Sequence, residues 1–165
     1  FEENAMSSAI VEQIQAAMEA EAAASKFYRD SAAKTSSQEG QDLLTQLADF
    51  EQSHYDNLAK LKDSLTQGEG YIDYSGTTFR KTEIPEAAKK KVEENIDDVI
   101  EILGVAIDAE MKAYDRYSKM AKEAEDPKGR AMFEKFAEEE SFHRRILADQ
   151  HFQLSNRGGI WFYSD

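Results

Sequence analysis

The chain has 165 residues, a formal net charge of −13 at pH 7 and no cysteine. Its length suits one domain with a buried core, so we expect residues 1–165 to form a single domain. The acidic charge makes nucleic acids and anionic membrane surfaces unfavourable partners. The lack of cysteine excludes disulfides, thiolate metal sites and catalytic thiols.

The sequence contains no apolar run of membrane-spanning length, and its first residues lack the apolar segment of a signal peptide. We therefore expect a cytoplasmic protein that does not contact membranes. We assign no function to residues 1–5, which precede the first methionine.

The apolar periodicity predicts an all-α chain, and the first two of its helices form a hairpin. The first helix spans about residues 8–34. The second starts at a capping box made by Ser36 and Glu39 and ends near Gln67, before a pair of glycines. Because the connection between them is short, we expect antiparallel neighbours.

Residues 68–84 form the long irregular stretch of the chain. They contain Tyr71, Tyr74 and Phe79, and this aromatic content argues against a loose linker. We expect a crossover that lies along the bundle. Pro85 then opens a short lead-in turn.

The second half of the chain predicts another helix hairpin. Its first helix occupies about residues 92–124, and its second starts with Asp126 as the cap and Pro127 at the first helical position. That helix ends near residue 154. The tail 155–165 is aromatic and packs either on the bundle or on a second subunit, so a homodimer is left open.

Each predicted helix carries an apolar seam at spacings of three and four residues, the pattern of a core-facing surface. A glutamate interrupts each seam, and in two helices a histidine follows three residues later. These residues are Glu21, Glu51 with His54, Glu110, and Glu140 with His143. Residues three apart lie above one another on a helix, so each Glu-x-x-His pair can bind one ion.

Each of these residues has a counterpart at a constant distance along the chain. The repeat pairs Glu21 with Glu110, Tyr28 with Tyr117, Glu51 with Glu140, and His54 with His143, each 89 residues apart. Such an internal repeat predicts two helix hairpins of one design. We expect a pseudo-twofold axis to relate them, with the site between the halves.

Four glutamates and two histidines would give each of two metal ions one terminal carboxylate and one imidazole, with two carboxylates left to bridge. Oxygen-rich ligation with one imidazole per ion suits iron or manganese better than zinc or calcium. Buried carboxylates without a cation would repel one another and cost free energy through desolvation. The pattern therefore predicts a two-metal site.

Other polar residues near the seams have plainer interpretations. Tyr28 and Tyr117 lie two turns beyond a seam glutamate, so each is either a hydrogen-bond donor to a ligand carboxylate or an ordinary core tyrosine. His151 is expected at the surface or near a helix end. Glu138 and Glu139 point away from the seam and are expected to face solvent.

Residues 8–153, with the Ala-Glu-x6-Tyr and Glu-x-x-His motifs repeated in both halves, resemble the ferritin-like di-iron superfamily and, within it, the rubrerythrin-like group. The resemblance implies a four-helix bundle with a long crossover between the second and third helices. It also implies six iron ligands, with Glu51 and Glu140 as bridges. These six are Glu21, Glu51, His54, Glu110, Glu140 and His143.

The chain departs from that family's pattern at three points. Rubrerythrins have a further carboxylate three residues after the third-helix glutamate, where this chain has Ala113, so that extra ligand is missing. Their cysteine-bound rubredoxin-type iron is also missing, so we expect an external electron donor. The six ligands resemble the ferroxidase site of bacterioferritin, but Gln52 replaces its haem-binding methionine and no fifth helix is expected. We therefore expect no haem, and a storage cage is not favoured.

These features favour a di-iron oxidoreductase in which two Fe(II) ions reduce hydrogen peroxide or O2, as a peroxidase or ferroxidase. The sequence identifies no catalytic residue beyond the ligands. Two alternatives stay open: an iron-storage or iron-transfer protein, and a bundle that holds metal without turnover. Whether an organic molecule is oxidised is also left open.

Overall fold

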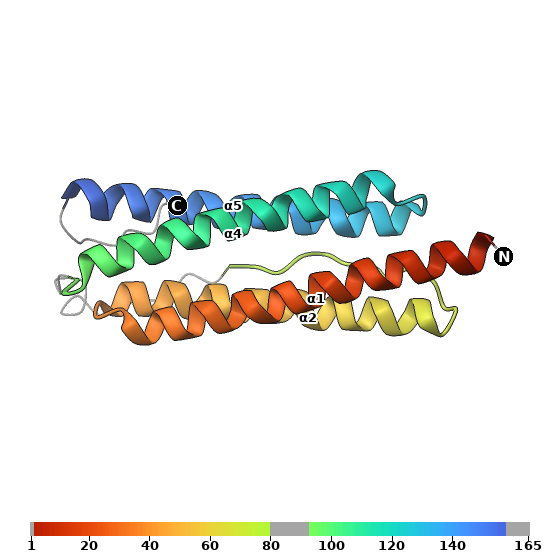
Figure 1. The fold of residues 1–165 in the computed structure, drawn as a ribbon, viewed down its shortest axis with the longest axis horizontal. Coiled ribbons are helices and arrows are strands. Elements are labelled where there is room, and N and C mark those ends of the chain that lie inside the picture. The colour runs from red at the N-terminus through yellow and green to blue at the C-terminus, as the bar shows by residue number, and fades with distance from the viewer. Residues whose placement is uncertain (1, 80–92, 158–165) are drawn as a thin grey trace.

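The computed structural model describes residues 2–79 and 93–157 and forms four long helices (Figure 1). They are α1 (Glu2–Lys34), α2 (Gln38–Thr66), α4 (Ile96–Glu123) and α5 (Pro127–Arg157). The described residues contain no strand, which confirms the all-α fold. No described helix combines the length and the apolar character needed to cross a membrane.

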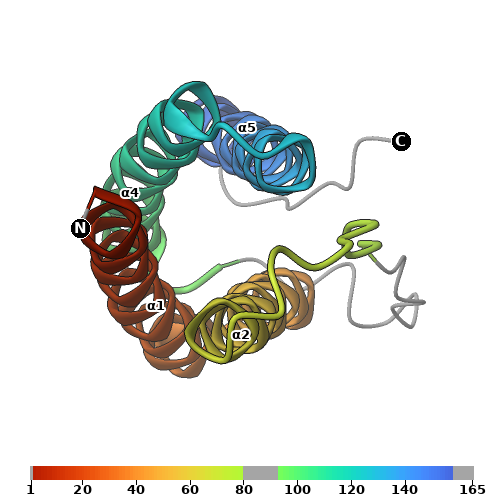
Figure 2. The same ribbon diagram turned by 90° about the vertical axis from the view of Figure 1, so that its right-hand side faces the viewer.

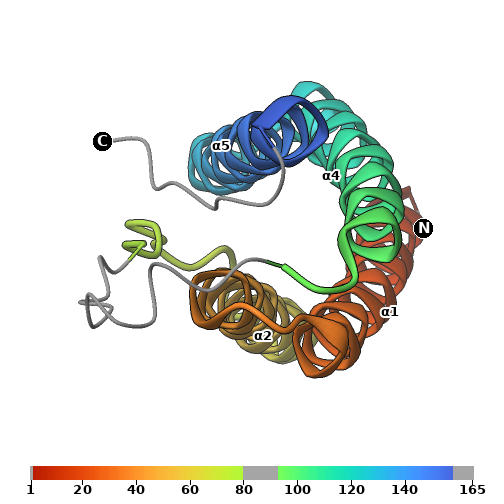
Figure 3. The same ribbon diagram turned by 90° about the vertical axis from the view of Figure 1, so that its left-hand side faces the viewer.

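The helices are arranged as two antiparallel hairpins, α1 with α2 and α4 with α5 (Figure 1). Seen along the bundle, α1 lies beside α4, whereas the crossover after α2 runs along the side where α2 and α5 face each other (Figures 2 and 3). The crossover carries the chain back along the bundle, so α4 runs parallel to α2. This is the four-helix bundle of paired hairpins that the internal repeat predicts.

Two helix starts show how local chemistry sets the boundaries. Asp126 caps α5, because its Oδ1 accepts the backbone N–H groups of Lys128 and Gly129, as predicted. At α2 the predicted cap is wrong by one residue, since Ser37 accepts from the N–H of Gly40.

Ser36 has a different role from the predicted one. Its N–H and hydroxyl both donate to Glu93 Oε1, which ties the turn between α1 and α2 to the start of the second hairpin. This long-range contact competes for the Ser36 side chain, which is why the cap moves to Ser37.

Other boundaries differ from the predicted ones. Helix α1 starts at Glu2 instead of near residue 8 and α5 continues to Arg157 instead of ending near residue 154, whereas α4 starts later than predicted, at Ile96 instead of near residue 92. The expected turn after Pro85 and the aromatic tail lie outside the described residues, as do positions 80–84 of the crossover.

The crossover lies along the bundle, as the sequence predicts, and close contacts hold it against α5. Tyr71 lies over Gly129, where an added Cβ would come within 2.5 Å of the tyrosine ring. Further along, Thr77 donates its backbone N–H to Glu139, and its hydroxyl lies 3.0 Å from that of Ser53 on α2. These contacts fix the crossover to both α2 and α5.

The bundle core consists of two apolar clusters. One surrounds Ile14, Leu58, Leu61 and Phe133, and the other surrounds Leu44, Leu47, Val99, Leu103 and Leu147. Along α1 and along α2, one segment contributes side chains to the first cluster and another segment contributes to the second. The predicted site residues lie between these two segments. Apolar packing therefore holds the helices in register on both sides of a polar layer.

Replacing Gly76 with alanine should weaken the attachment of the crossover. Gly76 has a φ of +94°, and an added Cβ would lie 2.7 Å from Lys135 Cε and 2.9 Å from Glu139 Oε1. We expect the free energy of unfolding, measured by urea denaturation, to fall by about 1–3 kcal/mol. Gly70→Ala is the matched control, because Gly70 has a φ of +87° with nothing near its Cβ position. An equal loss in both variants would contradict a role for the close approach at Gly76.

Candidate metal centre

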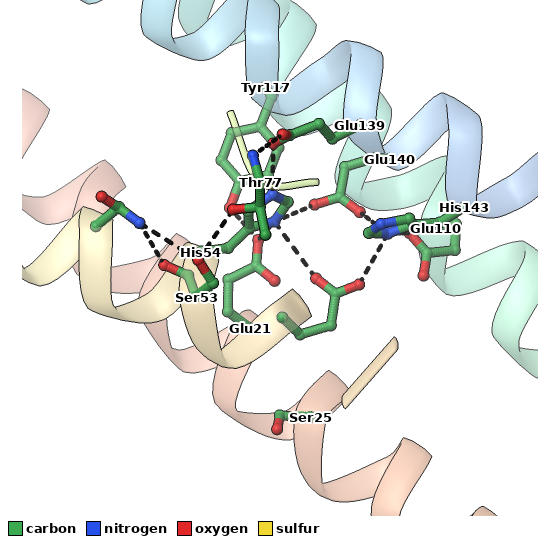
Figure 4. A network of polar contacts seen from close by, with 12 residues as sticks. Glu21, Ser25, Ser53, His54, Thr77, Glu110, Tyr117, Glu139, Glu140 and His143 are labelled. Carbon is green, nitrogen blue, oxygen red and sulfur yellow. Dashed lines mark hydrogen bonds and ion pairs between the residues drawn. The ribbon is translucent and has the colours of Figure 1, made fainter. Parts of the chain in front are cut away.

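All six residues predicted from the repeat converge in the middle of the bundle (Figure 4). Each of the four helices contributes one glutamate, and α2 and α5 each add a histidine. None of the six side chains is appreciably exposed, and His54, Glu140 and His143 are fully buried. The six residues are buried because they lie on the apolar seams of their helices, and these seams form the core of the bundle.

Their side-chain atoms form two overlapping groups of potential ligands. One group contains Glu21, Glu51, His54 and Glu140, and the other contains Glu51, Glu110, Glu140 and His143. Within each group, one nitrogen or oxygen atom per residue lies within 4.8 Å of the others. Glu51 and Glu140 belong to both groups, which is the arrangement expected of carboxylates between two ions.

Both imidazoles turn the same nitrogen toward the carboxylates. His54 Nδ1 lies 2.8 Å from Glu140 Oε1 and 3.5 Å from Glu21 Oε1. His143 Nδ1 lies 3.1 Å from Glu51 Oε1 and 3.6 Å from Glu110 Oε2. Each ring therefore offers one nitrogen to its own group of oxygens.

Several atoms of the centre have no hydrogen-bond partner among the described residues. Those that face the interior of the centre are both oxygens of Glu140, Oε2 of Glu110 and Nδ1 of His54, all of them buried. Buried polar atoms without partners are rare in folded proteins, because leaving them unsatisfied costs free energy. A bound cation would satisfy these atoms, and the oxygen-rich set with one imidazole in each group fits iron or manganese.

The electrostatics of the metal-free centre also favour a cation. Burial and the neighbouring charges of Glu51 and Glu140 raise the pKa values of Glu21 and Glu110 well above the ordinary range. The two outer carboxyls therefore keep their protons to higher pH than an exposed glutamate does. Metal ions bound at the centre would take the place of these protons.

The two shared carboxylates behave in the opposite way. Burial alone would raise their pKa values, but the histidines outweigh it and hold the pKa of Glu51 well below its ordinary range and that of Glu140 at about 2. Burial disfavours the charged form of both imidazoles, but the surrounding carboxylates raise the pKa values of His54 and His143. Without metal, the charged histidines thus balance the two shared carboxylates.

Two buried tyrosines hold the outer carboxyls across the bundle. The Tyr28 hydroxyl on α1 donates to Glu110 on α4, and the Tyr117 hydroxyl on α4 donates to Glu21 on α1. Burial raises both tyrosine pKa values, so the hydroxyls stay protonated donors. Both rings also belong to the apolar clusters, so each tyrosine fills both of the roles considered from the sequence.

The sequence interpretation missed one residue of the centre. Glu138 is exposed, as expected, but the expectation for Glu139 is wrong: its side chain is buried and its Oε2 lies 2.9 Å from His54 Nε2 (Figure 4). The crossover covers this face of α5 and turns it into interior surface. The aromatic content of residues 68–79 was the available signal, but it did not show which helix face they cover.

The third histidine takes no part in the centre. His151 lies in the last part of α5, is only partly buried and belongs to neither group of ligand atoms. This agrees with its expected position near a helix end.

Comparison with known proteins agrees with this geometry. A solved structure of a hypothetical protein from Pyrococcus furiosus superposes with a TM-score of 0.71 at 22% sequence identity, covering 93% of this chain and 92% of that chain. This likeness concerns the fold alone. No functionally curated protein matches the chain. The family model for rubrerythrin matches residues 12–151, a range that includes both hairpins and all six residues of the centre, and the chain therefore belongs to the rubrerythrin family.

Proposed function

We propose that the protein is a di-iron oxidoreductase that reduces hydrogen peroxide or O2. The observation that carries the proposal is the pair of overlapping, buried ligand groups that share Glu51 and Glu140. Glu21 and His54 would complete one ion's ligands, and Glu110 and His143 the other's. Iron bound there supplies the two electrons that convert peroxide and two protons into two water molecules.

The chain's own residues provide position and shelter for this chemistry. Tyr28 and Tyr117 orient the outer carboxyls by hydrogen bonds, and the apolar clusters on both sides keep bulk water away. Because the sequence contains no cysteine, the electrons that restore Fe(II) would come from a separate protein or a small reductant.

An access route for the oxidant lies between α1 and α4. A cavity of about 410 Å³ is bounded by Glu21, Glu51, Glu110 and Glu140 and reaches Val105, which is 51% exposed. Its walls include the alanines Ala20, Ala24, Ala109 and Ala113, which form two pairs under the internal repeat. Small side chains thus leave a path from the surface to the carboxylates.

Replacing Glu51 with glutamine should abolish the activity, because it removes a carboxylate shared by both ligand groups. Elemental analysis of wild-type protein grown with ample iron should give about two iron ions per chain. Peroxide-dependent oxidation, followed by the absorbance of the ferric protein, should fall by more than about 100-fold in the variant. Glu138→Gln is the control, since Glu138 is an exposed glutamate on the same helix as Glu140.

Full peroxide-dependent turnover by Glu51→Gln would overturn the proposed function. Repeated turnover with an added reductant separates an oxidoreductase from an iron-storage or iron-transfer protein, which would oxidise its iron once and retain or release it. Iron that binds but does not react with either oxidant would indicate a bundle that holds metal without turnover.

Filling the cavity should slow the reaction without removing the metal. Ala113→Leu and its counterpart Ala24→Leu place a larger side chain on the path to the carboxylates. We expect oxidation by peroxide, measured by stopped-flow absorbance, to slow by about 10-fold or more while iron content is unchanged. Ala22→Leu is the matched control, because Ala22 is exposed on α1 and does not line the cavity. Unchanged rates in both cavity variants would show that the oxidant enters elsewhere.

A further inference from the structure

The two histidines of the centre differ in what contacts the ring nitrogen that points away from the carboxylates. His54 Nε2 lies 2.9 Å from Glu139 Oε2. His143 Nε2 is buried and has no hydrogen-bond partner among the residues that the structure describes. The two halves of the centre are therefore not equivalent, although their ligands are.

Glu139 is itself fixed by the crossover. Its Oε1 accepts the backbone N–H of Thr77 at 2.6 Å, and its Oε2 accepts the hydroxyl of Tyr74 at 2.7 Å. A carboxylate that accepts from Tyr74 and Thr77 acts as an acceptor toward His54 as well. The contact between Glu139 Oε2 and His54 Nε2 is therefore a hydrogen bond when Nε2 carries a proton and donates it to Glu139. With the proton on Nε2, the lone pair of His54 Nδ1 is directed toward Glu21, Glu51 and Glu140.

The internal repeat shows what replaces this carboxylate in the other half. The residue 89 positions before Glu139 is Phe50. Its ring packs perpendicular to the His143 ring, with 4.3 Å between the centroids. The position that holds a carboxylate beside His54 therefore holds an apolar ring beside His143. The sequence alone encodes this difference, at the repeat pair Phe50 and Glu139.

We infer that the two metal positions fill in order, and that the position made by Glu21, Glu51, His54 and Glu140 binds first and more tightly because Glu139 orients His54. A carboxylate on the far N–H of a ligand histidine fixes the ring and makes its free nitrogen a better donor, and its loss typically costs 10- to 100-fold in metal affinity. Glu139 is thus a positioning residue. The inference rests on the proposed two-metal centre.

The ordered binding can be tested by titrating the metal-free full-length protein with Fe(II) under anaerobic conditions in a calorimeter. The wild type should show two steps whose dissociation constants differ by about 10- to 100-fold. In Glu139→Gln the tighter step should weaken by a similar factor, because an amide cannot accept from Tyr74, Thr77 and His54 together. The weaker step should not change.

Two further variants separate positioning from a general structural effect. Glu138→Gln makes the same change at the adjacent exposed position and should leave both steps unchanged. Tyr74→Phe removes one donor to Glu139 but keeps the ring, and should weaken only the tighter step, by less than Glu139→Gln does. Mössbauer spectra with one equivalent of ⁵⁷Fe(II) should show one predominant iron environment in the wild type and a more even mixture of two in Glu139→Gln.

The possible results distinguish this inference from the proposed function. Two equal binding steps in the wild type, or an equal weakening of both steps in Glu139→Gln, would overturn the ordered binding and leave the di-iron proposal intact. A wild-type protein that binds no iron at all would overturn both.

Discussion

The burial of four carboxylates and two imidazoles in one layer of the bundle is the constraint on which the rest of the structure depends. Apolar clusters on both sides keep water out, so the charges must be balanced by protons, by histidine or by a cation. In the metal-free protein the raised pKa values of Glu21 and Glu110 favour their neutral, protonated forms. In that balance the two oxygens of Glu140 have only ion-pair contacts with the histidines and make no hydrogen bond among the described residues, so a cation fits the layer.

The same layer also joins the two hairpins. Tyr28 connects α1 to Glu110 on α4, Tyr117 makes the reciprocal connection, and His143 on α5 reaches Glu51 on α2. Polar contacts in a low-dielectric interior are strong and directional, so they fix how the hairpins face each other more tightly than apolar packing alone would. The centre is therefore both the candidate functional site and a part of the scaffold.

The crossover breaks the symmetry that the two hairpins would otherwise share. It passes over the seam between α2 and α5 once, and no second segment of the described chain repeats it on the opposite side. Glu139 meets Tyr74 and Thr77 there, whereas the equivalent position in the other half is Phe50. Membership of the rubrerythrin family accounts for the bundle and the paired ligand motifs. The unequal surroundings of the two histidines come from this chain's own residues.

The sequence by itself determined the helices, their pairing and the six residues that meet at the centre. Helical periodicity places each glutamate on a core-facing seam, and the 89-residue repeat relates the two hairpins; both can be read from the order of residues alone. It misplaced the cap of α2 and the exposure of Glu139. Both errors involve contacts between residues far apart in the chain: Ser36 bonds to Glu93, and Glu139 is covered by the crossover. Only the tertiary structure could decide these points, because periodicity assigns a residue to a face of its helix but does not determine which distant segment packs against that face.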